Sequence, residues 1–228
     1  MNPILLALDL GDLAAAERLA RAIKPHIGGY KVGLELMMSE GPESVSRIAR
    51  LGLPVFADAK LHDIPNTAAA AARALAAHGA RWVTAHASGG GRMLEAVADG
   101  LADRAGLLAV TVLTSLEDED VTISGLSAVS AQVEDFVAVA ASSGAEGVVC
   151  AVHEAAMVKE LAADLIVVTP GIRLEGDERD DQRRVATPEE AVGSGADLIV
   201  VGRAITGAPD PVASAAEIAD RVRRIRPV

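Results

Sequence analysis

The sequence predicts a single-domain (β/α)8 barrel over residues 1–228, and three observations support that prediction. Eight short apolar runs alternate along the chain with segments of helical periodicity. The length of 228 residues is slightly below the roughly 250 that are typical of this barrel. The turn after the first run, Asp9-Leu10-Gly11-Asp12, lacks the G-x-G-x-x-G pattern, which weakens the alternative of a doubly wound open sheet. No linker or low-complexity tract indicates a second domain.

The eight predicted strands are short apolar runs bounded by turn residues, as expected for strands that are buried on both faces of a parallel sheet. In chain order they cover residues 4–8, 30–34, 54–59, 82–86, 107–111, 148–151, 165–169 and 198–201.

The predicted helices follow from apolar residues at helical spacing, from prolines at first turns and from capping residues. Asp12 is expected to cap the first helix, in which Leu13, Leu19 and Ile23 lie on one face. The later helices are expected near residues 42–50, 66–78, 91–104, 129–142, 153–161, 188–194 and 211–224.

The composition argues against several classes of protein. Lys and Arg total 21 against 32 Asp and Glu, and the net charge of −11 argues against a nucleic-acid-binding surface, which needs a basic patch. No apolar run approaches the roughly 20 residues that span a bilayer, and the amino terminus lacks the pattern of a signal peptide. The single cysteine, Cys150, excludes an internal disulfide. We therefore expect a soluble, cytoplasmic protein with no nucleic-acid or membrane partner.

Positive charge is carried mostly by arginine, and the chain contains only four lysines: Lys24, Lys31, Lys60 and Lys159. Lysine offers an amine whose pKa burial can tune, whereas a guanidinium practically cannot give up a proton. Lys31 and Lys60 both lie in short apolar runs. These two lysines are therefore candidates for a chemical role.

Polar residues collect where the predicted strands end, which is the edge that carries the active site in such barrels. They include Asp9, Lys31, Asp58, Lys60, His86 and Thr114. A single Asp or Thr there is explained as well by an ordinary turn, but charged groups between apolar neighbours are costly to bury unpaired. Because side chains alternate along a strand, Asp58 and Lys60 are expected to share a face.

Other features of the same edge leave alternatives open. Asp63 is placed to cap the following helix, a role that is compatible with catalysis. Gly171, Gly202 and Arg203 match the phosphate site that is common after strands seven and eight, although Gly-Arg also occurs in ordinary turns. The polar segment 173–184 reads either as a lid over a ligand or as a solvated charged loop. Cys150 is expected to be a buried small residue rather than a nucleophile.

Residues 58–67, D-A-K-L-H-D-I-P-N-T, closely resemble the orotidine 5′-phosphate decarboxylase family, whose D-x-K-x-x-D-I-P-x-T signature they contain in full. Ala59 is the one visible departure, since a larger apolar residue is usual there. Supporting matches along the chain are Leu8-Asp9, Lys31-Val32-Gly33, Val112-Leu113-Thr114-Ser115, Thr169-Pro170-Gly171-Ile172-Arg173, Asp181-Gln182-Arg183-Arg184 and Val201-Gly202-Arg203. Their order and spacing resemble the short, single-domain bacterial form.

The resemblance implies a role for each matching residue. Lys60 would donate the proton to C6 of the pyrimidine, and Lys31, Asp58 and Asp63 would complete the charged array around it. The residues implied to bind substrate are Asp9, Lys31, Ile64, Thr67, Thr114, Arg173, Gln182, Gly202 and Arg203. The resemblance also implies a homodimer with shared active sites, because Asp63, Ile64 and Thr67 would reach into the partner's site, and it implies no metal or organic cofactor.

Two rival functions remain at this point. One is a related magnesium-dependent enzyme, such as 3-keto-gulonate-phosphate decarboxylase or hexulose-phosphate synthase, which shares D-x-K-x-x-D. Those relatives tend to carry Glu at the position of Lys31 and lack the I-P-x-T continuation. The other is a non-catalytic barrel that binds a phosphorylated metabolite, against which the intact set of Asp58, Lys60 and Asp63 argues.

Overall fold

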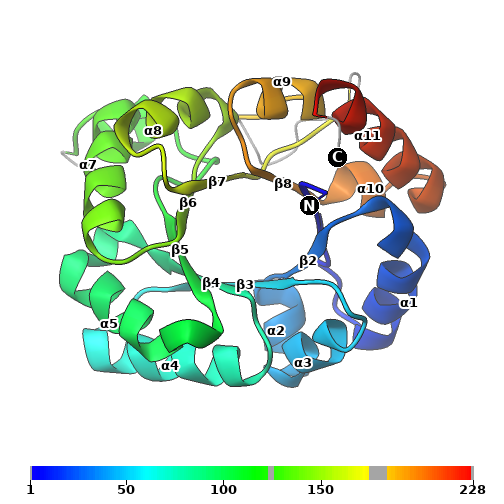
Figure 1. Ribbon diagram of the computed structural model, residues 1–228, viewed down its shortest axis with the longest axis horizontal. Helices are drawn as coiled ribbons and strands as arrows, with labels where there is room; N and C mark the ends of the chain where they lie inside the picture. The colour runs from blue at the N-terminus through cyan, green and yellow to red at the C-terminus, as the bar shows by residue number, and fades with distance from the viewer. Residues whose placement is uncertain (1, 123–125, 175–183, 227–228) are drawn as a thin grey trace.

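Eight parallel strands close into a barrel in the computed structural model, which describes residues 2–122, 126–174 and 184–226. Each strand pairs with the next along the chain, and the first pairs with the eighth to complete the ring. Helices surround this ring on its outside (Figure 1). The predicted (β/α)8 barrel is confirmed, and the open-sheet alternative is excluded because the sheet has no edge.

All eight strands lie where the apolar runs predict them, with ends that shift by at most a few residues. They are β1 (Ile4–Ala7), β2 (Gly29–Val32), β3 (Val55–Leu61), β4 (Trp82–His86), β5 (Gly106–Val110), β6 (Gly147–Val149), β7 (Ile166–Thr169) and β8 (Leu198–Val201).

The long helices also follow the prediction. Asp12 caps the first of them, because its Oδ1 accepts a hydrogen bond from the Ala15 backbone at 2.5 Å. The α-helices are α1 (Leu13–Ile23), α2 (Leu34–Glu40), α3 (Glu43–Ala49), α4 (Pro65–Ala77), α5 (Gly91–Leu101), α6 (Asp118–Thr122), α7 (Val129–Ser142), α8 (Ala155–Leu161), α9 (Pro188–Gly193), α10 (Arg203–Thr206) and α11 (Pro211–Ile225). Short 3-10 turns are η1 (Lys24–His26), η2 (Ala87–Gly89), η3 (Ala102–Arg104) and η4 (Val152–Glu154). None of the described helices is long and apolar enough to cross a membrane.

Three short helices, α2, α6 and α10, are absent from the prediction. Each has seven residues or fewer, too short for an apolar period to stand out, and none has the proline that marks the start of the equally short α3 and α9. The predicted second strand also extended to Leu34, which instead begins α2 after the N-cap residue Gly33.

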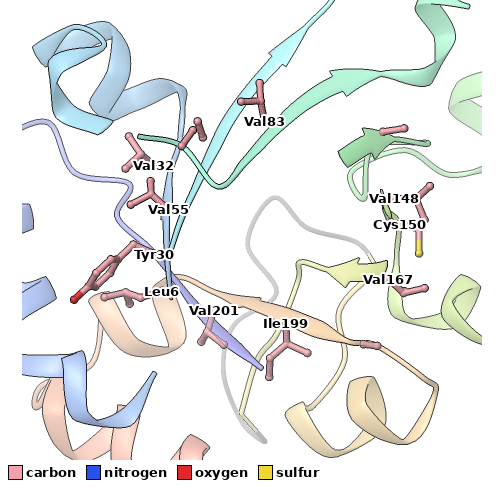
Figure 2. Packing of buried hydrophobic residues seen from close by; sticks show 14 of the residues in the cluster. Leu6, Tyr30, Val32, Val55, Val83, Val148, Cys150, Val167, Ile199 and Val201 are labelled. Carbon is pink, nitrogen blue, oxygen red and sulfur yellow. The ribbon is translucent and has the colours of Figure 1, made fainter. Parts of the chain in front are cut away.

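Alternation along the strands divides the core into two layers. On β1, Leu5 and Ala7 belong to the cluster inside the barrel, whereas Leu6 belongs to the larger outer cluster between strands and helices. Figure 2 shows the outer cluster, to which nearly every strand contributes. Tyr30 points outward in it, and its hydroxyl donates to the Ala20 carbonyl of α1 at 3.2 Å. The inner cluster comprises Leu5, Ala7, Phe56, Trp82, Leu108, Val168, Leu198 and Val200.

Candidate active site

A cavity of about 530 Å³ lies at the carboxyl ends of the strands, within the size range of small-molecule sites. Three residues of the inner cluster, Ala7, Phe56 and Val200, form part of its wall, so the packed interior of the barrel supports the cavity. The predicted site residues that line it are Asp9, Lys31, Asp58, Lys60, Thr114, Arg173, Gly202 and Arg203.

Strand alternation explains how several polar side chains come to face this cavity. Tyr30 and Val32 lie in the outer cluster, so Lys31 between them faces inward. In the same way, Asp58 follows Phe56 by two residues and Asp9 follows Ala7 by two. Each strand packs one face against helices and turns the other toward the barrel interior. The charged residues on the inner faces therefore come together at the cavity.

The charges form one continuous array of alternating sign. Lys31 Nζ lies 2.8 Å from Asp9 Oδ1 and 3.6 Å from Asp58 Oδ2. Lys60 Nζ donates to the same Asp58 oxygen at 2.6 Å. The side chains of Lys31 and Asp58 are each 10% exposed, so the centre of the array is shielded from solvent. Lys60 is 30% exposed and Asp9 is 45% exposed, so the two ends of the array meet solvent.

The array keeps the buried Asp58 ionised. Burial by itself would raise the pKa of this carboxyl, but the ammonium groups of Lys31 and Lys60 and hydrogen bonds from Lys60 and Thr84 outweigh it, and the pKa lies below its usual value. Nearby, burial and then His62 and Lys60 lower the pKa of His86, which favours its neutral ring.

Strand β3 is irregular where it carries Asp58 and Lys60. Ala57 pairs with Val83 on β4, but the next pair is Leu61 with Ala85, so three residues of β3 face the single residue Thr84. Lys60 has a φ of 48°, in the left-handed region that few residues other than glycine adopt. The two side chains do face one cavity, as predicted, but a bulge rather than a regular strand directs Lys60.

Sequence reasoning did not identify Thr84. Its Oγ1 donates to Asp58 Oδ1 at 3.0 Å and accepts a hydrogen bond from the Lys60 backbone at 2.9 Å. One threonine in an apolar run carries no signal of such a role. The predictions also missed Glu35, which lines the cavity from α2, a helix that the sequence did not reveal.

Asp63, Ile64 and Thr67 lie apart from the cavity of their own chain. All three are exposed, between the end of β3 and the first turn of α4, and none belongs to the residues that line the cavity. Asp63 is not the N-cap of α4, which corrects that interpretation. The helix begins at Pro65, so the residue before it, Ile64, is the N-cap. The Asp63 carboxylate instead accepts a hydrogen bond from the Ile64 backbone N–H at 2.6 Å.

The opposite side of the cavity carries glycine and arginine. Gly171 has a φ of 83°, a conformation that favours glycine, and Arg173 is buried two residues later. The Arg173 backbone donates to Ala186 at 3.0 Å, and Ala186 donates to Gly171 at 3.1 Å. Gln182 and most of the predicted lid, 175–183, lie outside the described residues.

Arg184 follows that segment and forms an ion pair that the sequence did not predict. Its Nη1 contacts Oε1 of Glu154, and both side chains are nearly buried. Its Nη2 donates to the carbonyls of Val112 and Leu113, at 3.2 and 2.9 Å, next to Thr114. Arg184 thus contacts both η4, through Glu154, and the loop after β5, through the two carbonyls. Cys150 is buried as predicted, and burial raises the pKa of its thiol well above the usual range.

Comparison with known proteins identifies close relatives over nearly the whole chain. The family model described as orotidine 5′-phosphate decarboxylase / HUMPS family matches residues 2–218. An orotidine 5′-phosphate decarboxylase of Anaeromyxobacter sp. (strain K) is 50% identical over 218 residues, which are 95% of this chain and 96% of the relative. A protein of the same name from Moorella thermoacetica is 43% identical over 236 residues, covering 99% of this chain and 94% of the relative.

Solved structures agree with the sequence comparison. The crystal structure of orotidine 5′-phosphate decarboxylase from Lactobacillus acidophilus superimposes with a TM-score of 0.84 at 35% identity, covering 97% of this chain and 99% of that one. The enzyme of the same name from Pyrococcus horikoshii OT3 gives a TM-score of 0.81 at 28% identity, covering 96% and 99%.

Proposed function

The chain belongs to the orotidine 5′-phosphate decarboxylase / HUMPS family, and we infer that it is a carboxy-lyase that converts orotidine 5′-phosphate to uridine 5′-phosphate. This reaction is the last step of de novo pyrimidine nucleotide synthesis. The observation that carries the inference within the family is the array Asp9–Lys31–Asp58–Lys60 at the wall of a cavity of nucleotide size.

Lys60 is the proton donor in this proposal. When the bond from C6 to the carboxylate breaks, CO₂ leaves and its bonding electron pair stays on C6. A proton from Lys60 Nζ then forms the new C6–H bond. The ammonium also stabilises the developing negative charge, and a fixed charge in a site shielded from water does so far better than one in bulk water. The contact of 2.6 Å to Asp58 supports this role because it holds the amine in place.

Asp58 acts on the substrate carboxylate. Its ionised carboxyl lies beside the proton donor, so a bound substrate brings a second negative charge near it, and loss of CO₂ relieves the repulsion. Lys31 bridges Asp9 and Asp58 and keeps both carboxylates fixed. No cofactor is needed, because the protein's own charges provide the stabilisation.

The remaining site residues bind the ends of the substrate. Arg203, Arg173 and Gly202 would hold the phosphate together with Gln182, and an arginine fork suits phosphate oxygens. Asp9 would bind a ribose hydroxyl and Thr114 would lie beside the pyrimidine. Since the phosphate is remote from C6, its binding energy can order the charged array before CO₂ leaves.

The active enzyme in this proposal is a homodimer with shared sites. Asp63, Ile64 and Thr67 are exposed and lie away from their own cavity, which supports a role in the site of a second copy. Ile64 is 68% exposed, so its side chain is accessible to a second copy of the chain. Asp63 would then join the partner's charged array, and Thr67 a ribose hydroxyl there.

The magnesium-dependent alternative fits the site less well. The Lys31 ammonium occupies the space between the Asp9 and Asp58 carboxylates, where a divalent cation would otherwise find two ligands. A positive charge fixed there repels a second one. The cytoplasmic location, the single-domain organisation and the lack of a nucleic-acid partner stay predictions from the sequence.

A single assay separates these functions. Purified protein is incubated with orotidine 5′-phosphate in EDTA, and the ultraviolet absorbance of the pyrimidine is followed as it becomes uridine 5′-phosphate. We expect turnover without added metal, whereas no loss of orotidine 5′-phosphate, either in EDTA or after Mg²⁺ is restored, would refute the proposal and favour the alternatives. Lys60→Ala should abolish turnover yet still bind uridine 5′-phosphate, because the amine acts mainly in the transition state. Near-normal kcat in that variant would refute the mechanism.

A further inference from the structure

Thr84 lies beneath the charged array and is fully buried in β4. It is not among the residues that line the cavity, so its side chain meets the protein rather than a ligand. Its hydroxyl bridges the two groups that the proposed reaction requires. The O–H donates to Asp58 Oδ1 at 3.0 Å, and the same oxygen accepts the Lys60 backbone N–H at 2.9 Å.

The chemistry of the partners determines the direction of both hydrogen bonds. An ionised carboxylate can only accept, and a backbone N–H can only donate. A threonine hydroxyl has one proton to give and lone pairs that accept, so it satisfies both partners at once. Valine has the same shape without these functions, and serine keeps them with one methyl group fewer.

The bulge explains why Lys60 needs such a partner. Residues 58–60 lie opposite Thr84 alone, between the pairs Ala57–Val83 and Leu61–Ala85. The Lys60 N–H therefore bonds a side chain of β4 where a regular ladder would offer a backbone carbonyl. The φ of 48° at Lys60 is unfavourable for a lysine and persists only where surrounding contacts hold it.

We propose that Thr84 is the positioning residue of the decarboxylation, because one hydroxyl fixes both the Asp58 carboxylate and the backbone from which Lys60 reaches it. The inference rests on the proposed function for its link to catalysis, and on the geometry alone for its link to positioning. Lys60 and Asp58 act as the bond to CO₂ breaks, whereas the phosphate is held on the other side of the cavity. Loss of the hydroxyl should therefore lower kcat and leave substrate binding nearly unchanged.

The test compares Thr84→Val with Thr84→Ser. For Thr84→Val we expect kcat on orotidine 5′-phosphate to fall about 10- to 100-fold, the range for loss of a buried hydrogen bond to a charged group. KM and the Kd for uridine 5′-phosphate should stay within about twofold, since the phosphate contacts remain. Thr84→Ser should recover most of kcat. Should Thr84→Val fail to fold, Thr84→Ala against Thr84→Ser makes the same comparison, because both lack the methyl group and only one lacks the hydroxyl.

Thr111→Val is the matched control. Thr111, directly after β5, is also a buried threonine, but its hydroxyl donates to the Val149 carbonyl at 3.0 Å rather than to a member of the array. Its kcat should stay within about twofold of wild type. An equal loss of kcat in the control, an unchanged kcat in Thr84→Val, or no recovery in Thr84→Ser would each overturn the proposal.

Crystal structures of wild type and Thr84→Val separate this inference from the proposed function. We expect the variant to lose the left-handed Lys60 backbone or to open the contact between Lys60 and Asp58. An unchanged array in the variant would overturn the positioning role. If wild type itself fails to decarboxylate orotidine 5′-phosphate, the proposed function is wrong, and the crystallographic comparison still decides whether Thr84 positions these side chains.

Discussion

Mixing two inactive variants, Lys60→Ala and Asp63→Ala, is expected to restore about a quarter of wild-type activity. Lys60 lines the cavity of its own chain, whereas Asp63 is exposed and lies away from that cavity. If each site takes Lys60 from one subunit and Asp63 from the other, neither variant alone can form a complete site. The mixed dimer forms one site with both substitutions and one site with neither.

The magnitude follows from two-fold symmetry. Random exchange of equal amounts makes about half of the dimers mixed, and one of the two sites in each mixed dimer is intact. About a quarter of all sites are then wild type. No such recovery is possible if Asp63 serves its own subunit, because every site then carries one substitution.

The assay needs proof that subunits exchange. The two variants carry different affinity tags and are mixed under mild denaturant, and the fraction of doubly tagged dimers is measured before activity on orotidine 5′-phosphate. The control is each variant put through the same treatment with itself, which should stay inactive. If doubly tagged dimers form and the mixture remains inactive, the shared-site proposal is refuted.

Three further predictions concern the phosphate side, Asp58 and the buried ion pair. Arg203→Ala should lower kcat/KM about 100-fold on orotidine 5′-phosphate, because a charge-assisted contact to phosphate is lost; a similar loss on orotidine, which lacks the phosphate, would show that Arg203 acts elsewhere. The pKa of Asp58 is lowered in the folded state, so its ionisation stabilises the fold above the unfolded pKa, and this stabilisation is lost as pH falls through the folded value. Urea unfolding from neutral pH to about pH 3 should therefore show Asp58→Asn less stable than wild type at neutral pH, with a difference that shrinks in acid; a constant difference would contradict the linkage. Arg184→Met should lower the free energy of unfolding by about 3 kcal/mol, because it leaves Glu154 buried without its partner, and Arg184→Met with Glu154→Gln should recover part of the loss, whereas additive losses would argue against the pair.

The sequence predicted the barrel well because its signals are local. Each buried strand is a short apolar run, and β8 lies at residues 198–201 as predicted. Helix α7 likewise covers residues 129–142, where the apolar period is long enough to define both ends. The short helices α2, α6 and α10 lack that length, and they also lack the proline that marks the start of α3 and α9.

In the candidate site, too, the features with local signals were predicted and the features that depend on distant contacts were not. Alternation along a strand predicted that Asp58 and Lys60 would face one cavity, and the charged residues at the strand ends do meet there. The bulge that directs Lys60 depends on Thr84, which lies 24 residues further along the chain. The pair of Glu154 and Arg184 is separated by 30 residues. Such contacts depend on how distant segments meet, and no period or motif within one segment encodes them.

The difference in exposure between the two lysines has a consequence for the whole catalytic cycle. Each conversion of orotidine 5′-phosphate to uridine 5′-phosphate and CO₂ transfers one proton from the enzyme to the product. A turnover therefore leaves the site one positive charge short until water returns a proton. Lys60, the proton donor in the proposed mechanism, is 30% exposed, whereas Lys31 is 10% exposed and lies between two carboxylates. The amine that must regain a proton, Lys60, is thus the one in contact with solvent. The amine that only holds the two carboxylates in place, Lys31, is shielded from solvent.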